Sequence, residues 1–265
     1  MRDGAVRAKP RKLVARDLRD AYDMYARYFR DPAMMANRDA RTTRRKLEHL
    51  VELLPLGAES RVVDVGPGDG TLFRLIAERV AVCRGVDPSP SAIDKLQHIF
   101  RDAPNVEFAL GTSQELPFPD ASFDVVVVNS VLHALPSITD VEQSLVELVR
   151  VCADGGVVFV GELPFRSELD RGILVHMGRK LRESGLRNYL RLVISIYVRP
   201  ILRGEPVVFY PARNLHIAEE DFRSMCRPLG ATVETYRHRE LAGPSTTRND
   251  YLLTLAPGGA PRGCG

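Results

Sequence analysis

The stretch VVDVGPGDG, residues 62–70, places two carboxylates, Asp64 and Asp69, around a turn that contains three glycines. A short apolar run precedes this turn, and a helical pattern of apolar residues that begins at Leu72 follows it. A strand, a tight glycine turn and a helix N-terminus together form the usual binding place of a nucleotide-like ligand. The sequence therefore predicts ligand binding here, and the neighbouring residues indicate which ligand.

These neighbours disfavour a phosphate group. Pro67 has no backbone N–H to offer, and each of the two carboxylates beside a diphosphate would cost on the order of 1–4 kcal/mol by Coulomb repulsion. The GK[ST] signature of a phosphate-binding loop is not found. The turn favours a nucleoside-like ligand that lacks phosphates and is positively charged. S-adenosylmethionine fits, because it carries an ammonium, a sulfonium, a ribose and an adenine.

Asp87 ends the next predicted strand, 19 residues after Gly68. At the tip of a neighbouring parallel strand, an acidic side chain can accept hydrogen bonds from both ribose hydroxyls. NAD sites use the same device, so Asp87 indicates a ribose without identifying the cofactor. Asp64 and Pro67 favour the sulfonium compound over NAD.

His133, in NSVLHAL, follows the fourth predicted strand and is the candidate catalytic residue. As a general base it would take a proton from a phenol, an enol or an amine during methyl transfer. The alternative is that it forms part of the wall of the site. Holding a nucleophile in line about 3 Å from the methyl group already supplies much of the rate, so a base is not required.

Apart from His133, the candidates for substrate contacts lie in the two basic flanks of the chain, residues 1–60 and 161–265. An N-terminal helix either folds over the cofactor or uses its tyrosines only for packing. Residues 171–205 carry eight Lys/Arg and two acidic residues beside an apolar run at 192–198. This segment is a solvated helical lid, a pocket for a substrate carboxylate or phosphate, or a helix on a membrane surface. The expected substrate residues are Tyr22, Tyr25, His133, His176, Arg187, Arg191, Tyr210 and His216.

Composition limits the class of protein. The 265 residues, 45% of them hydrophobic, suit one α/β domain with additions or two small domains. The four cysteines form no CxxC pair and the six histidines no HxxxH pair, so no metal site is expected. The scattered cysteines also argue against a disulfide framework, so we expect a cytoplasmic location. No signal peptide and no apolar run of roughly 20 residues is found.

The charges also follow a pattern along the chain. Residues 61–160 hold 7 Lys/Arg and 14 Asp/Glu, whereas residues 1–60 hold 14 and 9, and residues 161–265 hold 16 and 11. Either these charges only coat a solvated surface, or the acidic middle favours a cationic ligand and the basic flanks an anionic one.

Apolar runs and helical spacings alternate through the middle of the chain. The expected strands are 61–65, 82–86, 106–109, 124–128 and 156–160, and the expected helices between them are 70–79, 90–100 and 139–150. Strands such as 125–128 are apolar on both faces, which favours a parallel sheet covered by helices. Before them we expect a disordered segment 1–12 and helices 13–29 and 41–54. A helical insertion at 168–202, a helix 218–229 and strands 231–240 and 250–255 follow.

Four stretches resemble, in order and spacing, the motifs of class I S-adenosylmethionine-dependent methyltransferases of the ubiquinone/menaquinone-biosynthesis small-molecule type. They are VVDVGPGDG, GVDPS, GTSQELPFPDASFDVVVVNSVLHAL and LVRVCADGGVVFVGEL, within residues 60–162, with weaker support over 218–255. The resemblance implies an α/β fold with a Rossmann-like doubly wound seven-stranded sheet whose last strand is antiparallel. It also implies an N-terminal helical cap and a helical lid insertion after strand five.

The resemblance further implies roles for single residues. Asp64 and the backbone of Gly66 and Gly68 would bind the methionine amino acid, Asp87 with Pro88 the ribose, and Thr112, Ser113 and Gln114 the adenine. Asn129 would lie near the sulfonium and the methionine portion. One residue departs from the family pattern, because Thr112 stands where an acidic residue usually accepts the adenine amino group. A hydroxyl can accept one hydrogen bond, with Gln114 as a possible helper.

We therefore predict five parts: a cap (1–57), a cofactor-binding core (58–162), a substrate lid (163–217), the last helix and strands of the core (218–256) and a flexible tail (257–265). The predicted function is methyl transfer from S-adenosylmethionine to O, N or C of a small-molecule acceptor, anionic or amphiphilic. S-adenosylhomocysteine would be the product, peripheral membrane contact is possible, and no nucleic acid is expected. The alternatives are an RNA or protein methyltransferase and a non-catalytic cofactor-binding module.

Overall fold

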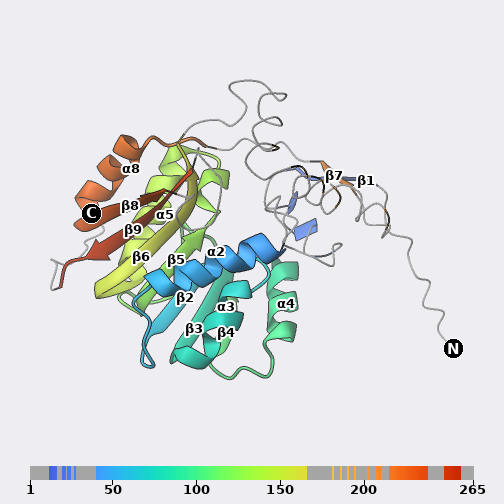
Figure 1. The fold of residues 1–265 in the computed structure, drawn as a ribbon, viewed down its shortest axis with the longest axis horizontal. Coiled ribbons are helices and arrows are strands. Elements are labelled where there is room, and N and C mark those ends of the chain that lie inside the picture. Colours follow the sequence, from blue (N-terminus) through green and yellow to red (C-terminus); the bar gives the residue numbers. More distant parts are fainter. Residues whose placement is uncertain are drawn as a thin grey trace.

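The computed structural model describes residues 12–16, 20, 21, 23, 24, 27, 40–165, 181, 186, 190, 194, 202, 207–209, 215–237 and 248–257. At its centre is a seven-stranded sheet (Figure 1). The strands are β2 (Arg61–Val65), β3 (Val82–Asp87), β4 (Val106–Leu110), β5 (Phe123–Asn129), β6 (Cys152–Pro164), β8 (Ala231–Arg237) and β9 (Arg248–Leu255).

The spatial order of the strands is β4-β3-β2-β5-β6-β9-β8. The first five strands in this order pair in parallel, and β9 pairs antiparallel with both β6 and β8. The last strand of the chain is thus the reversed one, and the predicted fold class is confirmed. In a parallel sheet of this kind the strand carboxyl ends meet at one edge, where ligands bind.

Helices cover both faces of this sheet. On one face α2 (Ala40–Leu53), α3 (Thr71–Ile76) and α4 (Pro90–Ile99) pack against a core that includes Val62, Val125 and Phe159. On the other face α5 (Ile138–Val151) and α8 (Glu219–Cys226) pack against a core that includes Val63 and Val126. Each inner strand is therefore apolar on both sides, as its valine-rich sequence predicts.

One prediction about the N-terminal segment is wrong. Residues 12–14 form strand β1 (Lys12–Val14), which pairs in parallel with β7 (Val207–Phe209), so the expected helix does not begin at Leu13. The described residues between 20 and 27 are helical, as expected. A strand of three residues has no readable periodicity, and its partner lies almost two hundred residues away, so no local pattern reveals it.

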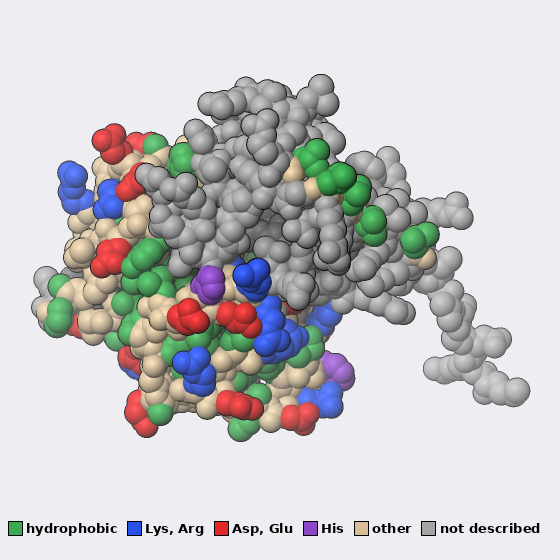
Figure 2. Space-filling model, viewed as in Figure 1, with side chains coloured by type: hydrophobic (Ala, Val, Ile, Leu, Met, Phe, Trp, Pro, Cys, Tyr) green, Lys and Arg blue, Asp and Glu red, His purple; other side chains and the backbone are tan. Residues whose placement is uncertain are grey.

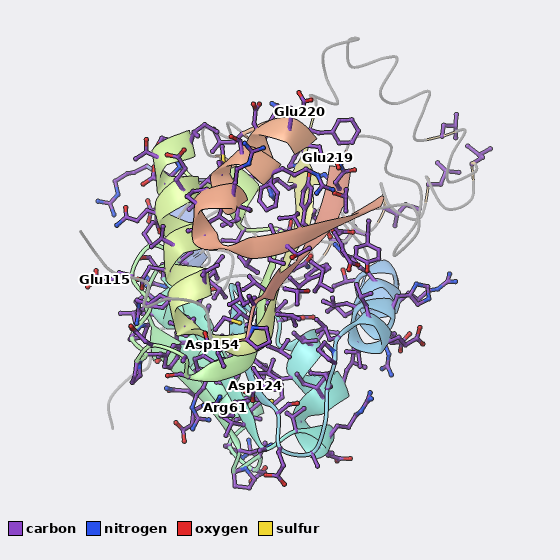
Figure 3. All side chains as sticks on the ribbon, turned by 90° about the vertical axis from the view of Figure 1, so that its left-hand side faces the viewer. Arg61, Glu115, Asp124, Asp154, Glu219 and Glu220 are labelled. Carbon is purple, nitrogen blue, oxygen red and sulfur yellow. The ribbon has the colours of Figure 1, made fainter. Side chains whose placement is uncertain are left out.

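At the amino edge of the sheet an ion pair links β2 to β5. Arg61 Nη2 lies 2.8 Å from Asp124 Oδ1, and the Arg61 backbone N–H donates to the same carboxylate. Figure 3 shows these two residues together at the lower end of the sheet, far from Glu219 and Glu220 at the start of α8. The opposite, carboxyl edge carries the side chains described next.

Candidate functional site

The turn between β2 and α3 needs glycine at three positions. Gly66, Gly68 and Gly70 have φ values of 78°, 57° and 73°, in the left-handed region that side chains disfavour. A Cβ on Gly66 would lie 2.4 Å from Val131 Cγ2, and one on Gly70 would lie 2.5 Å from Phe100 Cε2. Among the described residues no atom lies within 4 Å of a Cβ placed on Gly68, so the described part of the chain leaves the space beside this backbone open.

Asp69 is used inside the turn. Its Oδ1 accepts hydrogen bonds from Thr71 N at 3.0 Å and from Thr71 Oγ1 at 2.6 Å, at the start of α3. The carboxylate therefore satisfies the first backbone N–H of the helix and the Thr71 hydroxyl, and Asp64 is left as the carboxylate to meet a ligand.

Asp64, on β2, is 5% exposed, and its Oδ1 has no hydrogen-bond partner among the described residues. Burial, helped by the charges of Asp87 and Asp69, raises the pKa of Asp64 to about 7. A buried carboxyl oxygen without a partner is costly in a native fold and calls for a function. A cationic ligand at the strand end would supply the missing partner.

Asp87 is the last residue of β3, the neighbour of β2 in the sheet. Burial raises the pKa of Asp87 to about 6. The Ser89 N–H, which donates to Asp87 Oδ1 at 2.9 Å, lowers this pKa, and the charge of Asp23 raises it further. Pro88 and Ser89 lead into α4, where Ser89 Oγ accepts from Ala92 N and caps the helix. Asp64 and Asp87 thus lie at adjacent strand tips, as predicted.

The N-terminal segment docks beside Asp87 through a contact that the sequence did not reveal. Asp23 Oδ1 accepts from Ser89 Oγ at 2.9 Å and from Ser91 N at 3.1 Å. Burial acts to raise the pKa of Asp23, but these hydrogen bonds hold it below its usual value. The segment that carries Tyr22 and Tyr25 is therefore anchored at the predicted ribose position, although these two tyrosines lie outside the described residues.

The residues expected to meet adenine follow β4. Ser113 Oγ lies 2.8 Å from Ser144 Oγ of α5, and Gln114 Nε2 donates to Asp140 Oδ1 at 3.4 Å. The side chains of Ser113 and Gln114 therefore attach this loop to α5. Thr112 forms an isolated bridge with Glu115, and its role toward adenine stays a prediction.

Asn129, the last residue of β5, contacts a group of buried charges that the sequence analysis missed. Lys46 Nζ of α2 donates to Asn129 Oδ1 at 2.9 Å, and also approaches Glu162 and Asp250. The signal was present in the sequence, because Lys46 interrupts the apolar stripe of α2 one turn before Leu50.

Two of the three histidines predicted near the substrate, His133 and His216, lie in segments that contact each other. His133 is buried in the 3₁₀ turn Leu132–Ala134 after β5, and its carbonyl oxygen accepts from Leu215 N at 2.8 Å. His216 follows Leu215 directly, with an exposed side chain. The segment before α8 therefore returns to the carboxyl edge, as expected, and the choice between base and wall for His133 stays open.

The remaining substrate candidates, His176, Arg187, Arg191 and Tyr210, lie outside the described residues. In the same region Leu186, Leu190 and Ile194 are exposed by 63%, 48% and 44%. Figure 2 shows acidic and basic side chains interspersed over the described part of the face that it presents.

The described residues contain neither a membrane-spanning helix nor a metal-binding cluster. No described helix is long and apolar enough to cross a bilayer. The described part of the chain also holds no group of three or more His, Cys, Asp or Glu side chains that would bind a metal ion.

The core of this chain is similar to known methyltransferases. Residues 63–160 match the protein family described as Methyltransferase domain. An uncharacterized methyltransferase of Bacillus subtilis is 33% identical over 101 residues, which are 37% of this chain and 39% of that protein. The 27-O-demethylrifamycin SV methyltransferase of Amycolatopsis mediterranei is 28% identical over 180 residues, 60% of this chain and 65% of that protein. The chain thus spans less than half the length of the first of these relatives and about two thirds of the second.

Solved structures share the fold. A Haemonchus contortus phosphoethanolamine N-methyltransferase, solved with phosphoethanolamine and S-adenosylhomocysteine, superposes with a TM-score of 0.63 at 16% identity over 91% of this chain and 50% of that chain. The crystal structure of the Bacillus subtilis relative superposes with a TM-score of 0.53 at 15% identity, over 81% of this chain and 99% of that chain. Over residues 63–160 the resemblance to class I S-adenosylmethionine-dependent methyltransferases that the motifs predict is confirmed.

Proposed function

We propose that this protein binds S-adenosylmethionine at the carboxyl edge of its sheet and transfers the methyl group to a small-molecule acceptor. The observation that carries the proposal is the buried Asp64 oxygen, which has no hydrogen-bond partner among the described residues and lies beside a glycine turn and next to Asp87 on the adjacent strand. A carboxylate in that position fits an ammonium and repels a phosphate.

Each part of the cofactor has a candidate partner. Asp64 takes the α-ammonium, and the open backbone at Gly68 with that of Gly66 lies against the methionine portion. Asp87 accepts from the ribose hydroxyls, with Pro88 shaping the loop, and the segment from Thr112 to Gln114 meets the adenine. When bound, the cofactor supplies an electrophilic methyl group on its sulfonium.

A small organic acceptor is the choice best supported by the relatives. Two are named for such compounds, a demethylmenaquinone methyltransferase of Tropheryma whipplei and the demethylrifamycin enzyme. The basic flanks favour an acceptor that is anionic or amphiphilic, with Arg187 and Arg191 as the candidate contacts. His133 is either the general base for that acceptor or a wall residue that keeps it in line.

The fold leaves a non-catalytic or differently reactive protein as the second candidate. The crystal structure of the [4+2]-cyclase SpnF shares the architecture, with a TM-score of 0.59 at 14% identity. A site that binds the cofactor does not by itself guarantee methyl transfer.

Calorimetry with S-adenosylmethionine, S-adenosylhomocysteine and NADH tests the cofactor. We expect micromolar or tighter binding of the first two and none of NADH. Asp87→Ala should weaken the binding of S-adenosylmethionine roughly 10–100-fold, because two ribose hydroxyls lose a charged acceptor. Unchanged affinity in a folded variant would remove the ribose assignment, and binding of NADH would overturn the cofactor.

Turnover needs a separate experiment. The protein is incubated with S-adenosylmethionine and a panel of phenols, carboxylates and amines, and formation of S-adenosylhomocysteine is followed by mass spectrometry. Binding without product for every class would favour the non-catalytic module. Product only with bulk tRNA, lost steeply as salt rises, would favour an RNA methyltransferase.

A further inference from the structure

A buried lysine crosses from α2 to the carboxyl edge of the sheet. Lys46 is 1% exposed. Its Nζ lies 2.7 Å from Glu162 Oε1, 2.9 Å from Asn129 Oδ1 and 3.4 Å from Asp250 Oδ1. These residues come from α2, β5, β6 and β9, so four elements meet at one ammonium group.

The backbone of β6 is distorted to bring Glu162 into this group. Strict alternation would point Glu162 to the same face as Val158 and Val160, which is the α5 side of the sheet. The register with β9 shifts between Val160 and Leu163, and Glu162 has a φ of 63°. This bulge turns the Glu162 carboxylate to the α2 side, where Lys46 is.

The distortion is supported by hydrogen bonds of the same group. The Glu162 N–H donates to Asp250 Oδ1 at 2.6 Å, and Arg248 Nη1 lies 3.5 Å from Glu162 Oε2. Two cations therefore face two carboxylates. A buried ion group adds little net stability but is costly to break, so its contribution is to fix one arrangement of its members.

The member that reaches the site is Asn129. Lys46 is a donor only, so the atom it contacts is the amide oxygen, and the Asn129 amide nitrogen lies on the other side of the planar group. Gly161 on the neighbouring strand makes room for this side chain, because a Cβ there would lie 2.2 Å from Asn129 Oδ1. The side chain is thus held at its oxygen and offers its N–H₂ away from Lys46.

This donor shares a face with Asp64. Asp64 pairs with Val127 across β2 and β5, and Asn129 lies two residues beyond Val127, on the same side of the sheet. At ordinary strand spacings the two Cα atoms are about 8 Å apart. A carboxylate acceptor and an amide donor at that separation match the two ends of an α-amino acid, its ammonium and its carboxylate.

We propose that Lys46 is a positioning residue that, with Glu162 and Asp250, fixes the Asn129 amide so that its N–H₂ donates to the α-carboxylate of the cofactor. This inference rests on the proposed function and adds to it the residue that selects the amino-acid end of the ligand. Lys46 itself acts through Asn129.

The test compares two ligands that differ at this end only in the amino acid. S-adenosylhomocysteine carries the α-carboxylate, whereas 5′-methylthioadenosine has the same nucleoside and no amino acid. Asn129→Ala removes the donor, and Asn129→Asp keeps an oxygen for Lys46 but replaces the N–H₂ by a second oxygen. We expect both variants to bind S-adenosylhomocysteine roughly 10–100-fold more weakly by calorimetry, with the affinity for 5′-methylthioadenosine changed less than about twofold.

A double-mutant cycle then tests Lys46. Lys46→Met with Glu162→Gln removes one cation and one anion and leaves Arg248 with Asp250, so the buried charge stays balanced. This pair of changes should weaken the binding of S-adenosylhomocysteine when Asn129 is present, and should have no further effect on that binding in the Asn129→Ala variant. Losses that add, or that fall equally on both ligands, would mean a general structural role and would overturn the proposal.

Two outcomes separate this inference from the proposed function. If the native protein binds neither ligand, the cofactor assignment itself is wrong. If it binds both and the two Asn129 variants bind S-adenosylhomocysteine as the native protein does, the cofactor assignment stands and the positioning role falls. The Asn129 variants decide this even if the Lys46 variant fails to fold.

Discussion

At the scale of single residues, the buried carboxyl of Asp64 destabilises the ligand-free protein, and the same carboxyl favours binding of a cationic ligand. Its buried oxygen has no described partner, and burial raises the pKa of its carboxyl to about 7. Near neutral pH about half of the molecules therefore hold it protonated. A cationic ligand must bind the ionised form, so binding and ionisation of Asp64 are linked.

Binding of S-adenosylhomocysteine should therefore strengthen as pH rises. Between pH 6 and pH 7.5 the ionised fraction of Asp64 grows, and we expect the affinity to rise roughly 5–10-fold. Calorimetry in buffers of different ionisation enthalpy should also detect proton release below pH 7. Asp64→Asn is the control, and it should bind S-adenosylhomocysteine more weakly, with an affinity that does not rise with pH. A rise of the same size in that variant would show that another group causes the pH dependence.

The glycine turn shows how one element imposes different demands at neighbouring positions. Gly68 and Gly70 both have positive φ, but of these two only Gly70 has described neighbours, Phe100 and Leu96, within contact of an added Cβ. Gly68→Ala should lower the free energy of unfolding by about 1–2 kcal/mol from backbone strain alone. Gly70→Ala should lower it by about 2–5 kcal/mol, because overpacking against Phe100 is added. Urea denaturation measures both, and equal losses would mean that the Phe100 ring moves aside.

Docking of the N-terminal segment is the second prediction for an element. Asp23 holds the segment to the start of α4 by two hydrogen bonds, from Ser89 and Ser91. Asp23→Ala should speed amide hydrogen exchange around residues 20–27 roughly 10–100-fold. Arg16→Ala, which removes only an ion pair with an 87% exposed arginine side chain, is the matched control and should leave this exchange unchanged. Unchanged exchange in the Asp23 variant would show that other contacts dock the segment.

At the scale of the whole molecule, the sequence predicts what local patterns encode and misses what the sheet assembles. The buried valine runs place β2, β3 and β5 within one or two residues of their expected bounds. Lys46 meets Glu162 and Asp250 across 116 and 204 positions, and no spacing rule connects such residues. The bulge at Glu162 depends on these partners and was equally hidden, whereas Asp64 and Asp87 were found because each ends a predicted strand.

Four acidic residues of the described part of the chain form two pairs with opposite effects on stability. Asp64 and Asp87 have pKa values raised mainly by burial, to about 7 and about 6. Asp124 and Glu147 have lowered pKa values, mainly through hydrogen bonds from Arg61 and Arg150. The first group titrates in the folded protein above pH 5, and the second below about pH 4.5, so the two act in different pH windows.

The stability of the ligand-free protein should therefore be highest near pH 5. A carboxyl whose folded pKa is raised stabilises fully below its unfolded pKa and loses that contribution as pH rises through the folded value, here between about pH 4 and pH 7. A carboxyl whose pKa is lowered acts in the opposite sense and loses its contribution as pH falls below about 4.5. Thermal unfolding followed from pH 4 to pH 8 should give a Tm that falls from pH 5 to pH 8.

Two comparisons assign this decline to the site. Asp64→Asn cannot ionise, so its Tm should fall less over the same range and should exceed that of the native protein at pH 8. Saturating S-adenosylhomocysteine should flatten the decline in the native protein, because its ammonium stabilises the ionised Asp64, and should do so far less in the variant. A Tm that rises steadily from pH 5 to pH 8 without ligand would mean that Asp64 and Asp87 are ionised in the folded protein at little cost, and the electrostatic argument for a cationic ligand would fail.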